Sequence, residues 1–190
     1  MMGLPLKAKK ALVGVVPPAD ALALTFRPAT HADDDFLFRL YASTRAGEMA
    51  ATDWSPAQQE IFLRMQYTAR QRSYRAAFAR AEHSVISDGQ GAIGAWIVDR
   101  TREEVRLVDI AVVPGHRSRG LGRRLLETLM AEARAAEKPL RLQVLKTNPA
   151  LRLYTRLGFA PARDSDFHVQ MEWTPAALSS GAEPAAARAR

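Results

Sequence analysis

Residues 112–122 read VVPGHRSRGLG and join two segments with different hydrophobic patterns. The preceding residues 105–113 are mostly apolar and β-branched, which is typical of a buried strand, and Pro114 ends that pattern. Beyond the loop, leucine or methionine recurs at helical spacing, at positions 121, 125, 126, 129 and 130. The chain must therefore pass from a buried strand through a glycine-rich, basic loop directly into an amphipathic helix.

Such a junction is suited to binding a phosphate group. The first N–H groups of a helix have no partner within the helix and carry a partial positive charge. Glycines allow an anion to approach the backbone closely, because no Cβ atom stands in the way. Arg117, Arg119 and Arg123 can add charge-assisted hydrogen bonds. We therefore expect this loop to hold phosphate.

Two common phosphate-binding loops do not match this sequence. A Walker A loop requires Lys followed by Ser or Thr after its second glycine, whereas Leu121 and Gly122 follow Gly120 here. A dinucleotide-binding loop requires a third glycine where this chain has Leu125. The sequence therefore indicates neither a P-loop NTPase nor a dinucleotide-binding enzyme.

Hydrophobic periodicity along the rest of the chain predicts alternating strands and helices. Strands are expected over 22–27, 83–87, 92–100, 105–113, 140–146 and 167–173, and helices over 31–46, 55–80, 118–137 and 149–157. This order predicts an α/β fold with a central mixed, mainly antiparallel sheet and helices on both faces. The folded domain is expected to span 22–174, between a flexible leader (1–21) and a disordered tail (175–190) rich in Ala, Pro and Ser.

Composition narrows the possible chemistry. The chain has no cysteine and only four histidines, none of them in a pair with metal-ligand spacing, so we expect no metal site. No apolar run is long enough to span a membrane. The apolar run 11–16 is too short for a secretory signal, so a cytoplasmic protein is expected.

The chain is basic, with a formal net charge of +7 and a pI near 10.2. Such a charge attracts polyanions, including nucleic acid or a phosphorylated small ligand. The arginines are nevertheless scattered along the chain and form no single basic stripe, which is also what a compositional bias would produce. The charge leaves both explanations open.

Two motifs in order resemble those of the GNAT superfamily of acyl-CoA-dependent N-acyltransferases. The first is Arg117-x-x-Gly120-x-Gly122 after the apolar strand, and the second is NPALRLYTRLGF at residues 148–159. The predicted order of elements over 22–174 is also similar to that family. The resemblance implies an enzyme that transfers an acetyl group from acetyl-CoA to a primary amine.

The resemblance also assigns residues to acetyl-CoA. Backbone N–H groups of 119–123 and the Arg117 side chain would bind the pyrophosphate, and the strand end 110–113 would pair with the pantetheine arm. An N–H group near Val112 would polarise the thioester carbonyl. Asn148 would cap its helix, bind the cofactor, or do both. The implied cofactor residues are Ile110, Ala111, Val112, Val113, Arg117, Ser118, Arg119, Gly120, Leu121, Gly122, Arg123 and Asn148.

By the same resemblance, Tyr154 is the expected general acid, because a phenol stays protonated at neutral pH and can donate to the leaving thiolate. The resemblance assigns no general base, since the inward positions Arg106, Val108 and Gln143 carry none. Asp109 is the nearest carboxylate but faces away by strand alternation, unless a bulge turns it. Asp109 is therefore either a catalytic residue or the partner of a buried arginine.

The acceptor in such folds lies between the first two helices and the last strands. Candidate lining residues, which suit a cationic amine of a small molecule or peptide, are Tyr41, Glu48, Asp53, Trp54, Gln66 and Tyr74. The long helix 55–80 shapes this pocket or a homodimer contact. Two alternatives are a catalytically silent acyl-CoA-binding protein and a basic protein associated with nucleic acid such as tRNA. The second alternative is disfavoured because aromatic and basic residues do not interleave as RNA-binding modules require.

Overall fold

The computed structural model describes residues 24–179, so the predicted leader lies outside the described residues. The strands are β1 (Thr25–Pro28), β2 (Glu82–Ser87), β3 (Ala92–Arg100), β4 (Val105–Val112), β5 (Leu140–Leu145), β6 (Ala160–Asp164) and β7 (His168–Trp173). The helices are α1 (Asp34–Thr44), α2 (Ala46–Ala50), α3 (Pro56–Ala77), α4 (Leu121–Ala135), α5 (Leu151–Arg156) and α6 (Ala176–Ser179), with 3-10 turns η1 (His31–Asp33) and η2 (Pro114–His116).

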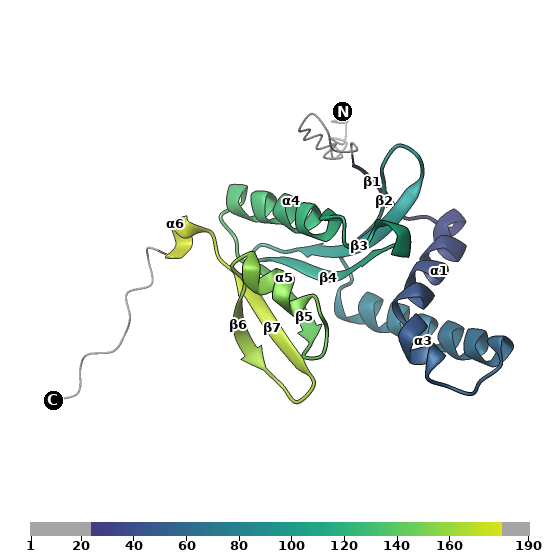
Figure 1. The fold of residues 1–190 in the computed structure, drawn as a ribbon. Coiled ribbons are helices and arrows are strands. Elements are labelled where there is room, and N and C mark those ends of the chain that lie inside the picture. The colour runs from purple at the N-terminus through teal and green to yellow at the C-terminus, as the bar shows by residue number, and fades with distance from the viewer. Residues whose placement is uncertain (1–23, 180–190) are drawn as a thin grey trace, which may run out of the picture.

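The seven strands form one sheet in the order β1-β2-β3-β4-β5-β7-β6 (Figure 1). Only β4 and β5 run parallel, and every other neighbouring pair is antiparallel. The predicted α/β fold with a mixed, mainly antiparallel sheet is therefore confirmed.

Successive residues of β3 show that both faces of the sheet are covered. Trp96 points into the main core, where Leu125 and Leu129 of α4 are completely buried. Ala95 points to the opposite face, where it packs with Leu37 of α1. Alternation of side chains along the strand therefore gives the sheet a helical layer on each side, as expected. Among the described residues, no helix combines the length and apolar composition that a membrane span requires.

The N-terminus of α3 forms as its sequence predicts. Ser55 Oγ accepts a hydrogen bond from the Gln58 N–H, and the Gln58 side chain in turn accepts one from the Ser55 N–H at 2.8 Å. Pro56 occupies the first helical position, where its missing N–H is not needed. This capping box starts the long helix that crosses one face of the sheet.

Three expectations about the elements need correction. The single helix expected over 31–46 is instead η1, α1 and α2, because the backbone leaves helical geometry at Arg45 (φ −107°, ψ 3°). Strand β6 was not expected, since its sequence APARD exposes all five residues and contains Pro161, so no apolar alternation marks it. Residues 176–179, expected to be disordered, form the helical turn α6.

Candidate active site

The two parallel strands at the centre of the sheet separate soon after they meet. β5 pairs with only the first three residues of β4, Val105 to Leu107. The Val113 N–H donates to Ile93 in β3, and N–H groups alternate between the two edges of a strand, so those of Ile110 and Val112 face the opposite edge. Within residues 24–179, no strand pairs with that edge beyond Leu107. It is therefore open to an extended ligand.

A bulge in β4 determines which face Asp109 occupies. Asp109 pairs with Ile97 of β3 and Leu107 pairs with Val98, which leaves Val108 as an extra residue between them. The bulge reverses the alternation, so that Asp109 shares a face with Arg106 instead of Leu107. Simple alternation predicted that Asp109 faces away, unless a bulge turned it. The bulge at Val108 does turn it, so Asp109 faces inward.

The loop before α4 presents a row of unpaired donors. Within residues 24–179, the backbone N–H groups of 118–123 have no hydrogen-bond acceptor. Ser118 (φ 60°) and Gly120 (φ 77°) adopt left-handed conformations, and this kind of backbone turns successive N–H groups toward one side. These donors lie at the positive end of the α4 dipole. The loop is thus a ready anion site, built from six of the residues expected to bind the cofactor.

The Arg117 side chain has other partners in this structure. Its Nε donates to the Val112 carbonyl oxygen at 2.8 Å, and its Nη2 donates to Ser43 Oγ at 2.7 Å. Arg117 thereby links the end of β4 to the C-terminal turn of α1, and its guanidinium lies at the open edge of β4. Any contact of this side chain with a pyrophosphate would require it to leave Val112 or to share its donors.

Asn148 forms a side-chain turn just before α5. Its Oδ1 accepts a hydrogen bond from the Ala150 N–H at 2.9 Å, which holds the turn that leads into α5. The expected helix cap at Asn148 is therefore corrected, because Ala150 is the N-cap residue of α5 and no side chain caps the helix there. The side-chain NH2 group of Asn148 has no partner within the described residues.

Tyr154 lies on α5, with its ring edge-to-face against Phe159. The residue is 7% exposed, and its hydroxyl has no partner among the described residues. The hydroxyl oxygen is not one of the buried unpaired atoms, so solvent reaches it. Burial, with a smaller effect from the charge of Asp109, raises the pKa of Tyr154 to about 12. The phenol therefore stays protonated at neutral pH.

Asp109 is joined to α3 by an ion pair. Its Oδ1 lies 2.5 Å from Nη2 of Arg70, and Arg70 Nε also donates to the Tyr74 hydroxyl at 3.0 Å. The guanidinium stands over the rings of Tyr41 and Tyr74, at 5.2 and 5.1 Å from their centroids. Asp109 Oδ2 has no partner within residues 24–179. The arginine partner expected for Asp109 is thus present, and one carboxylate oxygen stays available.

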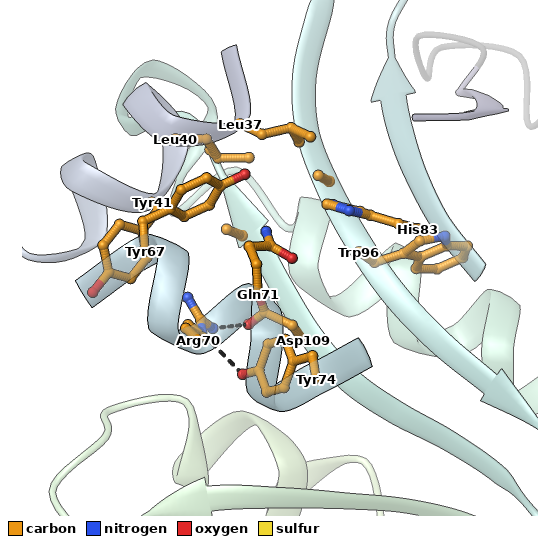
Figure 2. Close-up of a pocket in the computed structure, with 12 residues that line it drawn as sticks. Leu37, Leu40, Tyr41, Tyr67, Arg70, Gln71, Tyr74, His83, Trp96 and Asp109 are labelled. Carbon is orange, nitrogen blue, oxygen red and sulfur yellow. Dashed lines mark hydrogen bonds and ion pairs between the residues drawn. The ribbon is translucent and has the colours of Figure 1, made fainter. Parts of the chain in front are cut away.

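These groups surround a small cavity between α1, α3 and the sheet, with a volume of about 20 Å³ (Figure 2). Of the expected acceptor residues, Tyr41 and Tyr74 line it, whereas Glu48, Asp53, Trp54 and Gln66 do not. The structure adds Tyr67, Arg70, Gln71 and His83. The helical spacing of positions 63, 67, 70 and 74 could have indicated the inward face of α3, but His83 lies on a strand whose pairing the sequence does not reveal.

Among residues 24–179, no group of three or more His, Asp or Glu side chains is placed to hold a metal ion.

Residues 76–161 match the family model described as an acetyltransferase (GNAT) domain. This segment is a GNAT acetyltransferase domain. The matched segment runs from the end of α3 to β6 and includes the bulge, the open edge of β4, the donor loop and Tyr154. The GNAT domain thus contains both motifs that suggested the family.

Solved structures share the fold at low sequence identity. The PaiA N-acetyltransferase of Thermoplasma acidophilum, solved in complex with coenzyme A, is 17% identical, with a TM-score of 0.59 over 80% of this chain and 98% of that chain. An acetyltransferase of Thermus thermophilus is 20% identical (TM-score 0.57; 80% and 96%). The ribosomal-protein-S18-alanine N-acetyltransferase of Escherichia coli is 24% identical (TM-score 0.51; 80% and 93%). These likenesses establish the GNAT fold.

Proposed function

We propose that this chain transfers an acetyl group from acetyl-CoA to a primary amine of a small molecule or peptide. The observation that carries the proposal is the run of unpaired N–H groups at 118–123 beside the open edge of β4. The loop suits the pyrophosphate of acetyl-CoA, and the edge suits an amide-containing pantetheine arm, which can add to it as a strand does. The coenzyme A in the complex of the PaiA relative supports this assignment.

In this proposal the N–H groups of Ile110 and Val112 stabilise the charge that develops on the thioester oxygen. The amine nitrogen forms the new bond to the acetyl carbon as the carbon–sulfur bond breaks. The Tyr154 hydroxyl donates its proton to the leaving thiolate. Its high pKa supports this role, because the group is fully protonated at the start of each cycle.

The amine must lose a proton before it attacks, since an alkyl ammonium has a pKa near 10. Asp109 Oδ2 is the proposed acceptor, because the bulge turns this carboxylate toward the face covered by α1 and α3. The rings of Tyr41 and Tyr74 beside it already face the Arg70 guanidinium, so this wall of the cavity suits a positive charge. Acceptor and cofactor would then meet at β4 from two sides.

The test is acetyl transfer from acetyl-CoA to a panel of alkyl amines, aryl amines and peptide N-termini. Release of the coenzyme A thiol reports the reaction. We expect Tyr154→Phe to lower kcat by about 10²-fold, as loss of a positioned acid does, with the Kd of acetyl-CoA unchanged. The matched control is Thr155→Val, which removes an exposed hydroxyl from the next position of α5 and should keep full turnover.

The alternatives predict different results. Binding of acetyl-CoA without transfer to any amine of the panel would favour a silent acyl-CoA-binding protein. Full turnover in Tyr154→Phe would contradict the role of the tyrosine while leaving the transferase activity in place. Retention of RNA in salt-dependent gel shifts, without acetyl-CoA binding, would favour the nucleic-acid alternative.

A further inference from the structure

His83 on β2 lines two neighbouring spaces, as Leu37, Tyr67, Gln71 and Tyr74 also do. It lines the small cavity that also contains Asp109 and Arg70. It also lines a surface groove of about 830 Å³ between α1 and α3, whose walls include Asp34 and Arg75. The imidazole is half-buried and has no hydrogen-bond partner within residues 24–179. Among the side chains that line both spaces, His83 is the one able to exchange a proton near neutral pH, because the other titratable ones, Tyr67 and Tyr74, are phenols whose pKa values are raised by burial.

Sheet pairing places His83 and Asp109 on the same face. His83 pairs with Ile97 of β3, and Ile97 pairs with Asp109 of β4. Residues directly opposite one another in antiparallel strands point to the same side. Two strand spacings separate the two backbones by roughly 10 Å. Their side chains thus enter the same cavity from opposite sides of Ile97.

The cavity between them can hold one water molecule. Its volume of about 20 Å³ exceeds the minimum for a water, which also needs two to four polar partners. Figure 2 shows the amide of Gln71 reaching between the imidazole of His83 and the Arg70–Asp109 pair. Imidazole, amide and carboxylate supply those partners.

We propose that His83 is a proton relay that carries the proton of the acceptor ammonium from Asp109 to the groove between α1 and α3. This inference rests on the proposed acetyltransferase function. His83 touches neither the amine nor acetyl-CoA, so it acts through Asp109 and through the water between them.

The proton balance of the cycle is complete. Asp109 Oδ2 takes one proton from the ammonium and passes it through the water to His83, which releases it through the groove. After the amine attacks, its second proton replaces the one that Tyr154 gives to the thiolate. One ammonium and one acetyl-CoA thus yield one amide, one thiol and one released proton.

Several charges face His83 and set its protonation. Burial lowers the pKa of His83 below the ordinary value for histidine, while the charge of Asp109 opposes this effect. The imidazole is therefore neutral at pH 7 and able to accept a proton. The charged and titratable groups around it include Asp33 of η1, Asp34 and Tyr41 of α1, Tyr67, Arg70, Tyr74 and Arg75 of α3 and Asp109 of β4.

The first test compares His83→Gln with His31→Gln, using the best amine of the panel described above. His31 lies on the wall of the same groove with a fully exposed side chain, so its loss should change nothing. For His83→Gln we expect kcat/KM at pH 7 to fall by about 10-fold or more. This is less than the loss of about 10²-fold or more that removing a general base itself would cause. In this variant kcat/KM should rise about tenfold per pH unit between pH 7 and 9, because only amine deprotonated in solution reacts.

Chemical rescue separates a relay from a structural role. In His83→Ala, added imidazole should enter through the groove and raise the rate at least several-fold. The relay would be overturned if imidazole did not raise the rate of this variant. It would also be overturned if kcat/KM of His83→Gln depended on pH in the same way as that of the wild type.

A second measurement does not depend on turnover. NMR titration of the four histidines should show a lowered midpoint for His83 in Asp109→Asn, since a negative charge that favours imidazolium is removed. An unaltered His83 midpoint would contradict the coupling on which the relay depends. A wild-type chain that acetylates no amine would instead overturn the proposed function itself, and the relay with it.

Discussion

At the scale of single residues, two glycines of the donor loop have different structural requirements. Gly120 has φ 77°, in the left-handed region, whereas Gly122 is free of that constraint and a Cβ there would meet only Leu153 Cδ2 at 3.5 Å. We expect Gly120→Ala to lower the free energy of unfolding by about 1–2 kcal/mol, the usual cost of a left-handed L-residue. Urea denaturation measures this loss, with Gly122→Ala as the control that should stay within about 0.5 kcal/mol of the wild type. Equal losses in both variants would contradict this explanation.

Single residues were predictable from sequence where their roles are local. Asn148 accepts a hydrogen bond from the N–H two residues on, so the sequence indicated a local role but placed the start of the helix about two residues too early. Asp109 was not predictable in the same way, since its direction depends on a bulge created by pairing with β3. The contact of Arg117 with Ser43 joins residues 74 positions apart, which no local pattern reveals.

At the scale of elements, the contact between β3 and β4 leaves no space for a side chain at Gly94. A Cβ there would lie 2.7 Å from the Ala111 carbonyl oxygen, a backbone atom that cannot move without shifting β4. We expect Gly94→Ala to lower the free energy of unfolding by about 1–3 kcal/mol, as overpacking does. Because Ala111 adjoins the open edge, acetyl-CoA should also bind several-fold more weakly, which isothermal titration measures. Unchanged affinity in a destabilised variant would show that the edge tolerates this shift.

Elements with strong periodicity or caps were predicted well. The apolar strands β3 and β4 and the capped helix α3 appear close to their expected bounds. β6 was missed because an exposed edge strand with a proline has no hydrophobic signal. The break at Arg45 was also missed, since neither glycine nor proline occupies that position.

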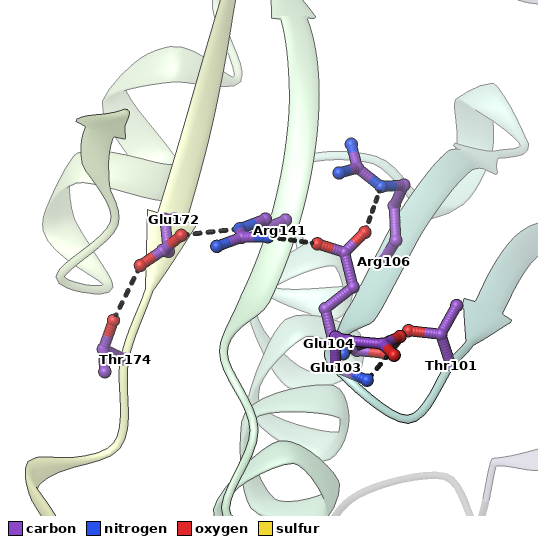
Figure 3. Close-up of polar contacts among 7 residues, drawn as sticks. All are labelled: Thr101, Glu103, Glu104, Arg106, Arg141, Glu172 and Thr174. Atoms are coloured by element: carbon purple, nitrogen blue, oxygen red, sulfur yellow. Dashed lines mark hydrogen bonds and ion pairs between the residues drawn. The ribbon is translucent and has the colours of Figure 1, made fainter. Parts of the chain in front are cut away.

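At the scale of the whole molecule, a network of charges ties together the strands on either side of the split (Figure 3). Glu104 accepts hydrogen bonds from Arg106 Nε and Arg141 Nη1, both at 2.6 Å, and Arg141 Nε donates to Glu172 of β7 at 2.6 Å. The Glu104 side chain is only 13% exposed. This network holds β4, β5 and β7 together at the end where β4 and β5 still pair.

We expect Glu104→Gln to lower the free energy of unfolding by about 1–3 kcal/mol at pH 7, because it weakens two charge-assisted hydrogen bonds of partly buried arginines. The matched control is Glu60→Gln, which removes an exposed i,i+4 pair with Arg64 and should cost less than about 0.5 kcal/mol. Denaturant melts of both variants give the comparison. Losses of the same size would mean that the network contributes no more than a surface ion pair.

The pH dependence of that difference follows from Glu104. Burial alone would raise the pKa of Glu104, but the hydrogen bonds from Arg106 and Arg141 outweigh it and lower the pKa below the ordinary value. A carboxyl group with a lowered pKa contributes stability that is present above its unfolded pKa, near 4.3, and is lost as the pH falls through its folded pKa. The gap between wild type and Glu104→Gln should therefore be constant from pH 7 to about 5 and shrink below that.

The general architecture was predictable because alternation and helical spacing repeat over many residues. The split between β4 and β5 was not, since three paired residues followed by divergence leave no mark on the apolar pattern of either strand. The same holds for the cavity beneath α3, whose walls come from α1, α3, β2, β3 and β4.

The central claim is that the unpaired donors at 118–123 bind the pyrophosphate of acetyl-CoA. The most direct test is isothermal titration of acetyl-CoA into the wild type, Gly122→Glu and Gly115→Glu. Both variants add one negative charge where a Cβ meets no close contact, but only the first lies among the donors. We predict binding by the wild type and by Gly115→Glu, and at least a tenfold loss, about 1.4 kcal/mol, for Gly122→Glu. Equal affinity in all three proteins, or no binding by the wild type, would contradict the account.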